Sequence, residues 1–533
     1  MEADCPRTAR EAEVLGARDG CDANDALGAR MDARTMTRDE RRADRWTDGR
    51  ARGGFERTVY ETLTMYERSF PAIGERFFKR SAWPTPEEVS AHANGDATFK
   101  MLYGEMYYRH LHQATTPTAE ERRGAWENYA ALFEALATGE ANMQLPNLWL
   151  YDMVDEFVYQ YQSFAQFKGS PKRTPEEVSA IKALDAKVWD RAGVAGLLKL
   201  LVEKSGIAQV LARERAGENS FAANEGYSAT SSNVLPTLGY CAQIGLCRLH
   251  VLAGDYEGAL AALDAIDLDK EGLFKKISGA YVTTAYHVGF SYFMLGRYTD
   301  AIRHLNAGIQ YIDRLKFGAT RPHALPLLLK RQDQMYALTA IIMALVPGQQ
   351  HLVDESVSLG LHQKYSAKMN RMAEGSLPVF DELFSYCCPK FIGDGDNHSA
   401  YTAQYKLFLE VVAAHAIIPK LRGYFEMYAS IKVDKLASFL EVSVDDLKAS
   451  FKAFEEGYTV MEWRGGASAL DGESTYCGDM RIVLEGDVVR AEELKRAKSA
   501  KEFLERVNNK LEMSLEDLAS AKPLLVKTSA IVG

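Results

Sequence analysis

A repeated helical hairpin constrains the fold of this chain more than any other feature of its sequence. Residues 282–312 read as two amphipathic helices that meet at Gly296 and are closed by Ala301. The same turn occurs earlier, within residues 250–266. In such a turn glycine permits a sharp reversal, an aromatic side chain fills the gap beneath it, and alanine lets the helices approach closely. The matched pairs are Gly254 and Gly296, Tyr256 and Tyr298, Ala259 and Ala301, and Leu260 and Ile302.

The two hairpins resemble those of tetratricopeptide repeats. One hairpin cannot bury its own apolar face, so neighbours must stack on it, and the stack is an extended right-handed superhelix rather than a catalytic pocket. At 533 residues the chain is too long for one core, since domains average roughly 150 residues. A superhelix escapes that limit because each repeat packs only on its neighbours. We therefore predict a mainly α-helical fold.

Composition limits the classes of partner. Hydrophobic residues make up 47% and charged residues 26% of the chain, which is ordinary for a soluble globular protein. The net charge of −10 disfavours extensive contact with nucleic acid phosphates, although a local basic patch could still contact RNA. Protein surfaces are the expected partners, and no small-molecule substrate is indicated.

Cysteine usage and hydropathy indicate a cytoplasmic protein. The seven cysteines form no CxxC pair, and their odd number argues against a secreted disulfide framework, so a reducing compartment fits best. The longest apolar run, residues 336–346, is shorter than the roughly 20 residues that span a bilayer. The N-terminus lacks the apolar segment of a signal peptide. We expect no membrane association.

The N-terminal half divides into a tail and a helical region. Residues 1–54 are rich in Ala, Arg, Asp and Gly and predict a disordered tail; their acidic residues disfavour a transit peptide. Residues 55–234 carry apolar side chains at helical spacing, and Pro86 with the acidic residues after it starts one of the helices. Residues 235–427 hold the helical repeats. No segment before residue 428 reads as a strand.

A winged helix is predicted over residues 428–490. Two short helices are joined tightly, and Ser443 is the expected N-cap of the second, with Asp446 three positions later. A β-hairpin with its turn at Gly486 follows. Residues 491–533 form a C-terminal helix and tail. The apolar positions of this helix are spaced for a helical bundle; they are Ala497, Ala500, Leu504, Val507 and Leu511.

The second helix of the winged helix argues against reading DNA, because residues 445–456 carry a net charge of −2. The hairpin suits another use, since an open strand edge can pair with a strand of a partner. Together with the bundle helix it supplies the candidate partner interface. Its residues are Ile482, Val483, Leu484, Val488, Val489, Leu504, Val507 and Leu511.

No catalytic, cofactor or metal site is predicted. His110 and His112 suggest zinc, but a third ligand at the required spacing is missing. The residues 394–398 offer two aspartates and a histidine without the glutamate of a calcium loop. Cys387 and Cys388 read as a half-buried pair. Asp155 and Glu156 are helix neighbours that cannot flank a substrate, so a solvated face or an interface salt bridge is expected.

A helical superhelix followed by a winged helix and a C-terminal helix is the layout of the PCI domain, whose helical part would begin near residue 300. Six blocks of sequence go further and resemble the subunit L family of eukaryotic translation initiation factor 3. The tail before Phe55 matches nothing in that family, and the loop 393–401 is shorter than its pattern. The blocks are ERFFKRSAWP (75–84), YGEMYYRHLH (103–112), LPNLWLYDMVDEFVYQYQSFAQF (145–167), YHVGFSYFMLGRYTDAI (286–302), DELFSYCCPKF (381–391) and SALDGE (468–473).

The resemblance implies a noncatalytic scaffold subunit without a cofactor. That factor binds the small ribosomal subunit and promotes recruitment of mRNA and initiator tRNA. Its PCI subunits pair through their winged helices and gather their C-terminal helices in a bundle, with subunit L beside subunits K and E. A noncatalytic PCI subunit of the proteasome lid or signalosome is the alternative, and a nucleic-acid-binding regulator is a third possibility.

Overall fold

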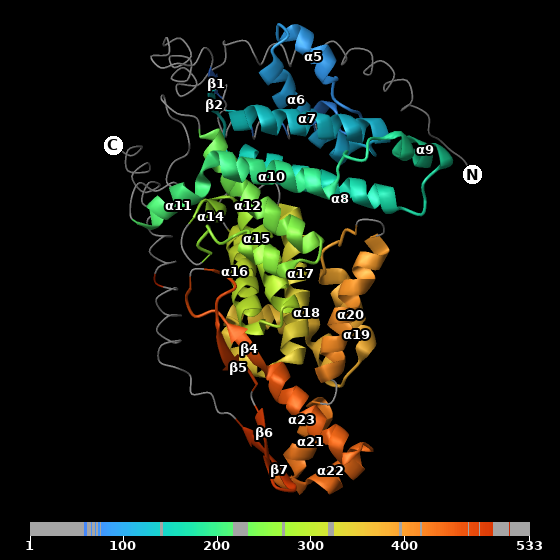
Figure 1. Ribbon diagram of the computed structural model, residues 1–533, viewed down its shortest axis with the longest axis vertical. Helices are drawn as coiled ribbons and strands as arrows, with labels where there is room; N and C mark the ends of the chain where they lie inside the picture. Colours follow the sequence, from blue (N-terminus) through green and yellow to red (C-terminus); the bar gives the residue numbers. More distant parts are fainter. Residues whose placement is uncertain are drawn as a thin grey trace, which may run out of the picture. The chain divides into compact units, whose positions relative to one another are not determined.

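The chain forms two compact units, each assembled from three stretches of sequence. Unit 1 comprises Met1–Thr339, Glu382–Leu409 and Trp463–Glu473, and unit 2 comprises the remainder. Both are mainly helical, as the sequence predicts (Figure 1). The tail over residues 1–54 lies outside the described residues. The computed structural model describes residues 58–60, 66, 70, 73–74, 76–138, 142–216, 233–268, 272–317, 325–393, 397–415, 418–466, 468–478, 480–493 and 511.

The first part of unit 1 is a stack of helices. Two of them begin with strong helix-start signals. Thr85 and Thr174 are N-caps, and each forms a capping box with the glutamate three positions later. A proline directly follows each threonine, at the first position of the helix. The helices here are α5 (Pro86–His92), α6 (Ala97–Ala114), α7 (Ala119–Thr138), α8 (Asn147–Gly169), α9 (Pro175–Ala183), α10 (Arg191–Ser205) and α11 (Ile207–Arg215).

The expectation that no strand precedes residue 428 is wrong. Strand β1 (Thr58–Tyr60) pairs in parallel with β2 (Asn142–Gln144), with Val59 opposite Met143. Each strand has three residues, which is too few to show the alternation of apolar and polar side chains that reveals a strand. Their pairing therefore leaves no trace in the local sequence.

A buried ionic cluster lies between α6 and α8. Glu105 is fully buried, pairs with Arg109, and accepts hydrogen bonds from Trp149 Nε1 at 2.9 Å and Tyr129 Oη at 3.3 Å. Asp152 lies 3.6 Å from Arg109 Nη1. Since a buried charge must be paired, these hydrogen bonds are what allow Glu105 to sit in an aromatic core.

Two carboxyl groups of α8 have unusually high pKa values. Burial raises the pKa of Asp152 to about 6, although the nearby Arg109 opposes the shift. Burial also raises the pKa of Glu156 to about 7, against the same arginine and a hydrogen bond from Gln160. The predicted apolar stripe of this helix is buried throughout; its members are Trp149, Met153, Phe157, Tyr161 and Phe164.

The repeated hairpins of unit 1 have the predicted turns. Gly254 and Gly296 have φ angles of 78° and 74°, a left-handed conformation that favours glycine. The alanines that follow, Ala259 and Ala301, are fully buried at the helix contacts. The helices are α12 (Val234–Leu252), α13 (Tyr256–Ala261), α14 (Leu273–Lys276), α15 (Ser278–Met294), α16 (Tyr298–Phe317) and α17 (Leu325–Leu345), the last of which continues into unit 2.

Residues 382–409 complete the aromatic core of unit 1. They hold the end of α19 (Leu377–Cys387) and most of α20 (Asn397–His415). Phe384 stacks on Phe408 with ring centroids 4.3 Å apart, and Tyr286 donates a 2.6 Å hydrogen bond to the carbonyl of Cys387. The core is thus shared between the repeats and segments that follow them by about a hundred residues.

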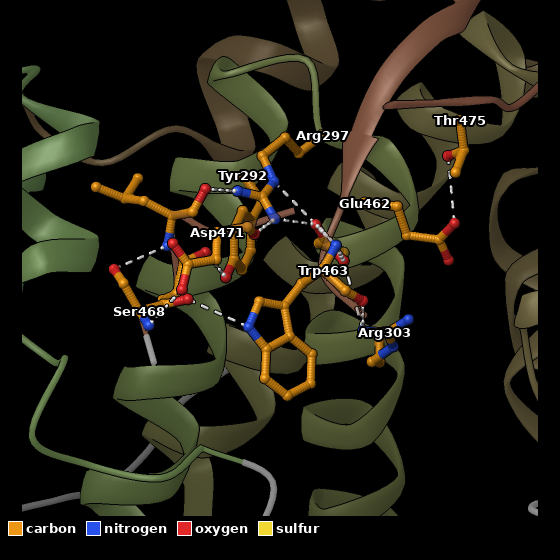
Figure 2. A network of polar contacts seen from close by, with 11 residues as sticks. Tyr292, Arg297, Arg303, Glu462, Trp463, Ser468, Asp471 and Thr475 are labelled. Carbon is orange, nitrogen blue, oxygen red and sulfur yellow. Dashed lines mark hydrogen bonds and ion pairs between the residues drawn. The ribbon is translucent and has the colours of Figure 1, made fainter. Parts of the chain in front are cut away.

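A polar network surrounds the second hairpin turn (Figure 2). Arg297, whose side chain is 6% exposed, donates 2.9 Å hydrogen bonds from its two terminal nitrogens to the carbonyls of Leu470 and Asp471. Its Nε donates to Asp300 Oδ2 at 2.9 Å. The backbone N–H of Trp463 donates to the same carboxylate. The segment Trp463–Glu473 therefore belongs to unit 1.

The rest of the segment 463–473 supports this network. Tyr292 lies beneath the guanidinium of Arg297 and donates to the carbonyl of Ala469 at 2.8 Å. Ser468 donates from its hydroxyl to Asp264 at 2.7 Å, and its backbone N–H donates to Asp471. The two sequence blocks 286–302 and 468–473 therefore meet in one structure.

Unit 2 holds further helices and the C-terminal strands. No helix in the described parts of the chain is long and apolar enough to cross a membrane. The elements are the 3-10 helix η2 (Pro347–Leu352), α18 (Glu355–Ala373), α21 (Ile418–Met427), β3 (Ser430–Lys432), α22 (Val433–Leu440), α23 (Val444–Tyr458), β4 (Thr459–Glu462), β5 (Glu473–Tyr476, whose first residue is in unit 1), β6 (Met480–Glu485) and β7 (Val488–Glu493).

Candidate protein-interaction site

The predicted winged helix is present in unit 2, where α21, α22 and α23 gather beside β6 and β7 (Figure 1). Its core is a cluster of apolar side chains from the three helices α21, α22 and α23 and from the strands β3 and β7. Ile482 of β6 packs at the margin of this core. The fully or largely buried members are Leu421, Ile431, Val433, Leu436, Ala437, Leu447, Phe451 and Val489.

The joint between the two short helices follows from local chemistry. Helix α22 ends in a Schellman turn, in which the N–H of Val442 donates to the carbonyl of Ala437 at 3.1 Å. Glu441 occupies the left-handed position of this turn with φ 57°, where glycine is usual. Ser443 then caps α23 by accepting from the N–H of Asp446 at 3.1 Å, as predicted.

The sheet of the winged helix has three strands in the order β3-β7-β6. Strands β6 and β7 form the predicted antiparallel hairpin, with Leu484 opposite Val489 and a turn at Gly486, whose φ is 62°. Strand β3 pairs antiparallel with β7 and sets Ile431 opposite Val489. Within the described residues the outer edge of β6 has no strand beside it.

The five candidate residues of the hairpin lie on two strands and differ in burial. Val489 is fully buried on the central strand, and Val488 lies next to it between Lys432 and Glu485. Ile482, Val483 and Leu484 lie on the outer strand β6, where Leu484 is 45% exposed. Strand β6 therefore presents the open edge, and Val489 has a packing role. Leu504 and Val507 lie outside the described residues, and Leu511 is exposed.

The outward face of α23 is acidic. Asp445, Asp446, Glu455 and Glu456 are all exposed, against the exposed Lys448 and Lys452. Lys452 is also 3.6 Å from Glu456, one helical turn away. A helix with this surface is repelled by the phosphates on either side of a DNA groove. The geometry thus supports protein contact at the sheet edge over contact with DNA along the helix.

Comparison with known proteins identifies the family. The family described as RNA polymerase I-associated factor PAF67 matches residues 121–511. Eukaryotic translation initiation factor 3 subunit L of Gallus gallus is 35% identical over 464 residues, covering 84% of this chain and 81% of that protein. The Homo sapiens subunit L has the same identity and coverage. The Nematostella vectensis subunit L is 33% identical over 464 residues, covering 85% of this chain and 87% of its own.

The chain belongs to the eukaryotic translation initiation factor 3 subunit L family. The resemblance drawn from the six sequence blocks is therefore confirmed. Four of those blocks fall inside the matched range 121–511. Two of the four, 286–302 and 468–473, meet in the network around Arg297. Family membership makes this chain a relative of translation initiation factor subunits.

The residues that suggested catalysis are engaged in packing. His110 Nε2 lies 3.0 Å from the carbonyl of Phe78, and its ring stacks on Trp83. His112 hydrogen-bonds the carbonyl of Tyr108, and burial lowers the pKa of its imidazole to about 4. No three His, Cys, Asp or Glu side chains in the described stretches are arranged to hold a metal.

The carboxylates and the cysteine that the sequence also offered as catalytic candidates have structural roles. Asp155 forms a 2.7 Å ion pair with Arg248, while Glu156 accepts from the amide of Gln160. Cys387 is buried, and burial raises the pKa of its thiol. Asp394 and Asp396 lie outside the described residues. In this subunit L relative, Asp155 and Glu156 are thus each engaged by a neighbouring side chain.

Sequence reasoning missed two features of the structure. Strand β3 has only three residues, and strands β4 and β5 have four each and are separated by the segment 463–472. The alternation of Ile431 between two exposed residues is a strand signal, but it is too short to be told from a loop. The role of Arg297 was also missed, because its partners lie more than 170 residues further along the chain.

Proposed function

We propose that this protein is a noncatalytic scaffold subunit of the eukaryotic translation initiation factor 3 complex. In this role it helps the complex bind the small ribosomal subunit and recruit mRNA and initiator tRNA. Membership of the subunit L family supports the proposal, and so does an acidic winged helix with an open strand edge. The subunit works in the cytoplasm, where initiation takes place.

The open edge of β6 is the observation that carries the scaffold role. A strand edge offers a row of backbone N–H and C=O groups, and a partner strand completes the sheet by pairing with them. Arg481 and Glu485 are exposed along β6, and such charges hinder unspecific pairing while they allow a complementary partner. We assign this edge to the winged helix of a neighbouring PCI subunit, which extends the sheet across the two chains.

The remaining contacts are part of the same proposal. We propose that the C-terminal segment with Leu504, Val507 and Leu511 joins a helical bundle with other subunits. We also propose subunits K and E as the neighbours of this chain. The small ribosomal subunit is contacted by the complex as a whole, and any contact of this chain with RNA is local because the net charge is −10.

Purification of the full-length protein under gentle conditions tests the proposal. It should migrate with the other initiation factor 3 subunits and with small ribosomal subunits. Replacing Leu484 with Lys places a third charge on β6, beside Arg481 and Glu485, and should weaken assembly at least tenfold. Met461→Lys is the matched control, since Met461 is 43% exposed on a different strand. Migration apart from initiation factor 3, or with a proteasome lid, would overturn the proposal.

A further inference from the structure

Exposed apolar side chains occur on α21 and α22 of the winged helix and on the residues that follow these helices. Met427 at the end of α21 is 69% exposed, and Phe439 on α22 is 41% exposed. Tyr428 and Val442 are exposed as well, and Tyr424 is half-buried beside them. These five residues are here named the aromatic patch. Clustered aromatic and methionine side chains are enriched at the centres of protein interfaces.

The rings of the aromatic patch are held in place by one another. Tyr424 stacks on Phe439 with centroids 5.6 Å apart and planes at 12°, and its hydroxyl donates to the Phe439 carbonyl at 3.2 Å. Tyr428 lies 6.4 Å from the same ring. A surface whose side chains are already ordered loses little entropy when a partner binds. The ordered rings of the aromatic patch therefore lower the entropic cost of binding a partner.

A lysine marks the chemistry of the partner. The ammonium group of Lys435 lies 5.6 Å from the ring centroids of both Tyr428 and Phe439. It makes no ion pair with any residue in the described parts of the chain. A carboxylate brought to this place meets the Lys435 ammonium and an apolar surface.

The ring contacts favour protein over RNA as the occupant. A base binds an aromatic side chain by stacking on a free ring face. Here Tyr424 stacks on Phe439, and the Lys435 ammonium lies over both exposed rings. Met427, whose flexible thioether side chain is 69% exposed, suits the apolar side chains of a helix.

We propose that the aromatic patch binds an amphipathic helix of another protein chain. The apolar side of that helix covers Met427, Phe439 and Val442, and one of its carboxylates pairs with Lys435. This contact is independent of strand pairing at β6, because Tyr428 precedes β3, the outer strand on the other side of β7. The winged helix thus joins two neighbours, one through each side of its sheet.

A photo-cross-linking experiment in the intact assembly tests the proposal. Met427 is replaced by p-benzoylphenylalanine in the full-length chain, the assembly is purified and irradiated, and the cross-linked peptide is identified by mass spectrometry. The expected product joins residue 427 to a helical segment of a different polypeptide that carries an Asp or Glu within one turn. Lys435→Glu should lower its yield at least tenfold, and replacing the partner's carboxylate with Lys should restore it.

Controls separate this contact from general effects. Lys452→Glu reverses an exposed charge on α23 and should leave the yield unchanged. The Leu484→Lys variant reports on the β6 edge alone, so failure of the scaffold proposal is read separately. Cross-links only to RNA, to a second copy of this chain or to its own residues would overturn the inference. The absence of any cross-link in the intact assembly would overturn it too.

Discussion

Replacing Arg297 with Met should release the segment 463–473 from the helical hairpin. The change keeps an unbranched side chain but removes the guanidinium, with its two bonds to the carbonyls of Leu470 and Asp471 and its ion pair with Asp300. Asp300 is 1% exposed, so it is left as a buried carboxylate with fewer partners. Breaking one side of a buried pair costs about 3–5 kcal/mol. The cost falls on the local opening of this segment.

Hydrogen exchange of the backbone amides measures that opening. The N–H groups of Trp463, Ser468 and Asp471 are hydrogen-bonded within the network. At 1.4 kcal/mol for each tenfold change, a loss of 3–5 kcal/mol accelerates their exchange by about 100-fold to 4000-fold. Mass spectrometry of peptides that cover residues 463–473 reads this change directly, with the ends of α15 and α16 as internal references.

Arg464→Met is the matched control for the same segment. Arg464 is 56% exposed and lies 4.0 Å from Glu473, and an exposed pair of this kind contributes about 0–1 kcal/mol. Exchange should therefore rise less than about fivefold. If Arg297→Met has an effect no larger than that of Arg464→Met, the buried network does not hold the segment and the reasoning fails.

Three further predictions concern stability. Glu441→Gly should stabilise the winged helix by about 0.5 kcal/mol in urea denaturation, because glycine relieves the left-handed strain at the end of α22; destabilisation would contradict this. Val489→Ala should cost about 2 kcal/mol in the same assay and Val488→Ala under about 1, since only Val489 is fully buried; equal losses would refute the assignment. The pKa of Glu156 is raised in the folded state, so its protonation stabilises the fold below the unfolded pKa and this stability is lost as pH rises through about 7. Glu156→Gln should remove that decline in thermal midpoint, which falls between about pH 4.5 and about pH 7. Glu127→Gln, at a side chain that is 60% exposed, should leave it in place.

The sequence by itself determined the local geometry of this protein. Gly254 and Gly296 specify hairpin turns, Ser443 specifies the start of α23, and Gly486 specifies the turn between β6 and β7. Each of these signals works through bonds within four or five residues. The interactions are complete within the segment, so they can be recognised without knowing what surrounds it.

Only the tertiary structure decided which distant segments meet. Strand β3 joins the hairpin and places Val489 in a core, which leaves β6 as the outer strand. Residues 463–473 accept hydrogen bonds from Arg297, and β1 pairs with β2 across more than 80 residues of chain. Such pairings depend on complementary groups in both segments, and neither segment alone specifies its partner. The sequence around Gly296 therefore predicted a helical repeat. Only the folded structure showed that the same hairpin, through Arg297, holds the segment 463–473.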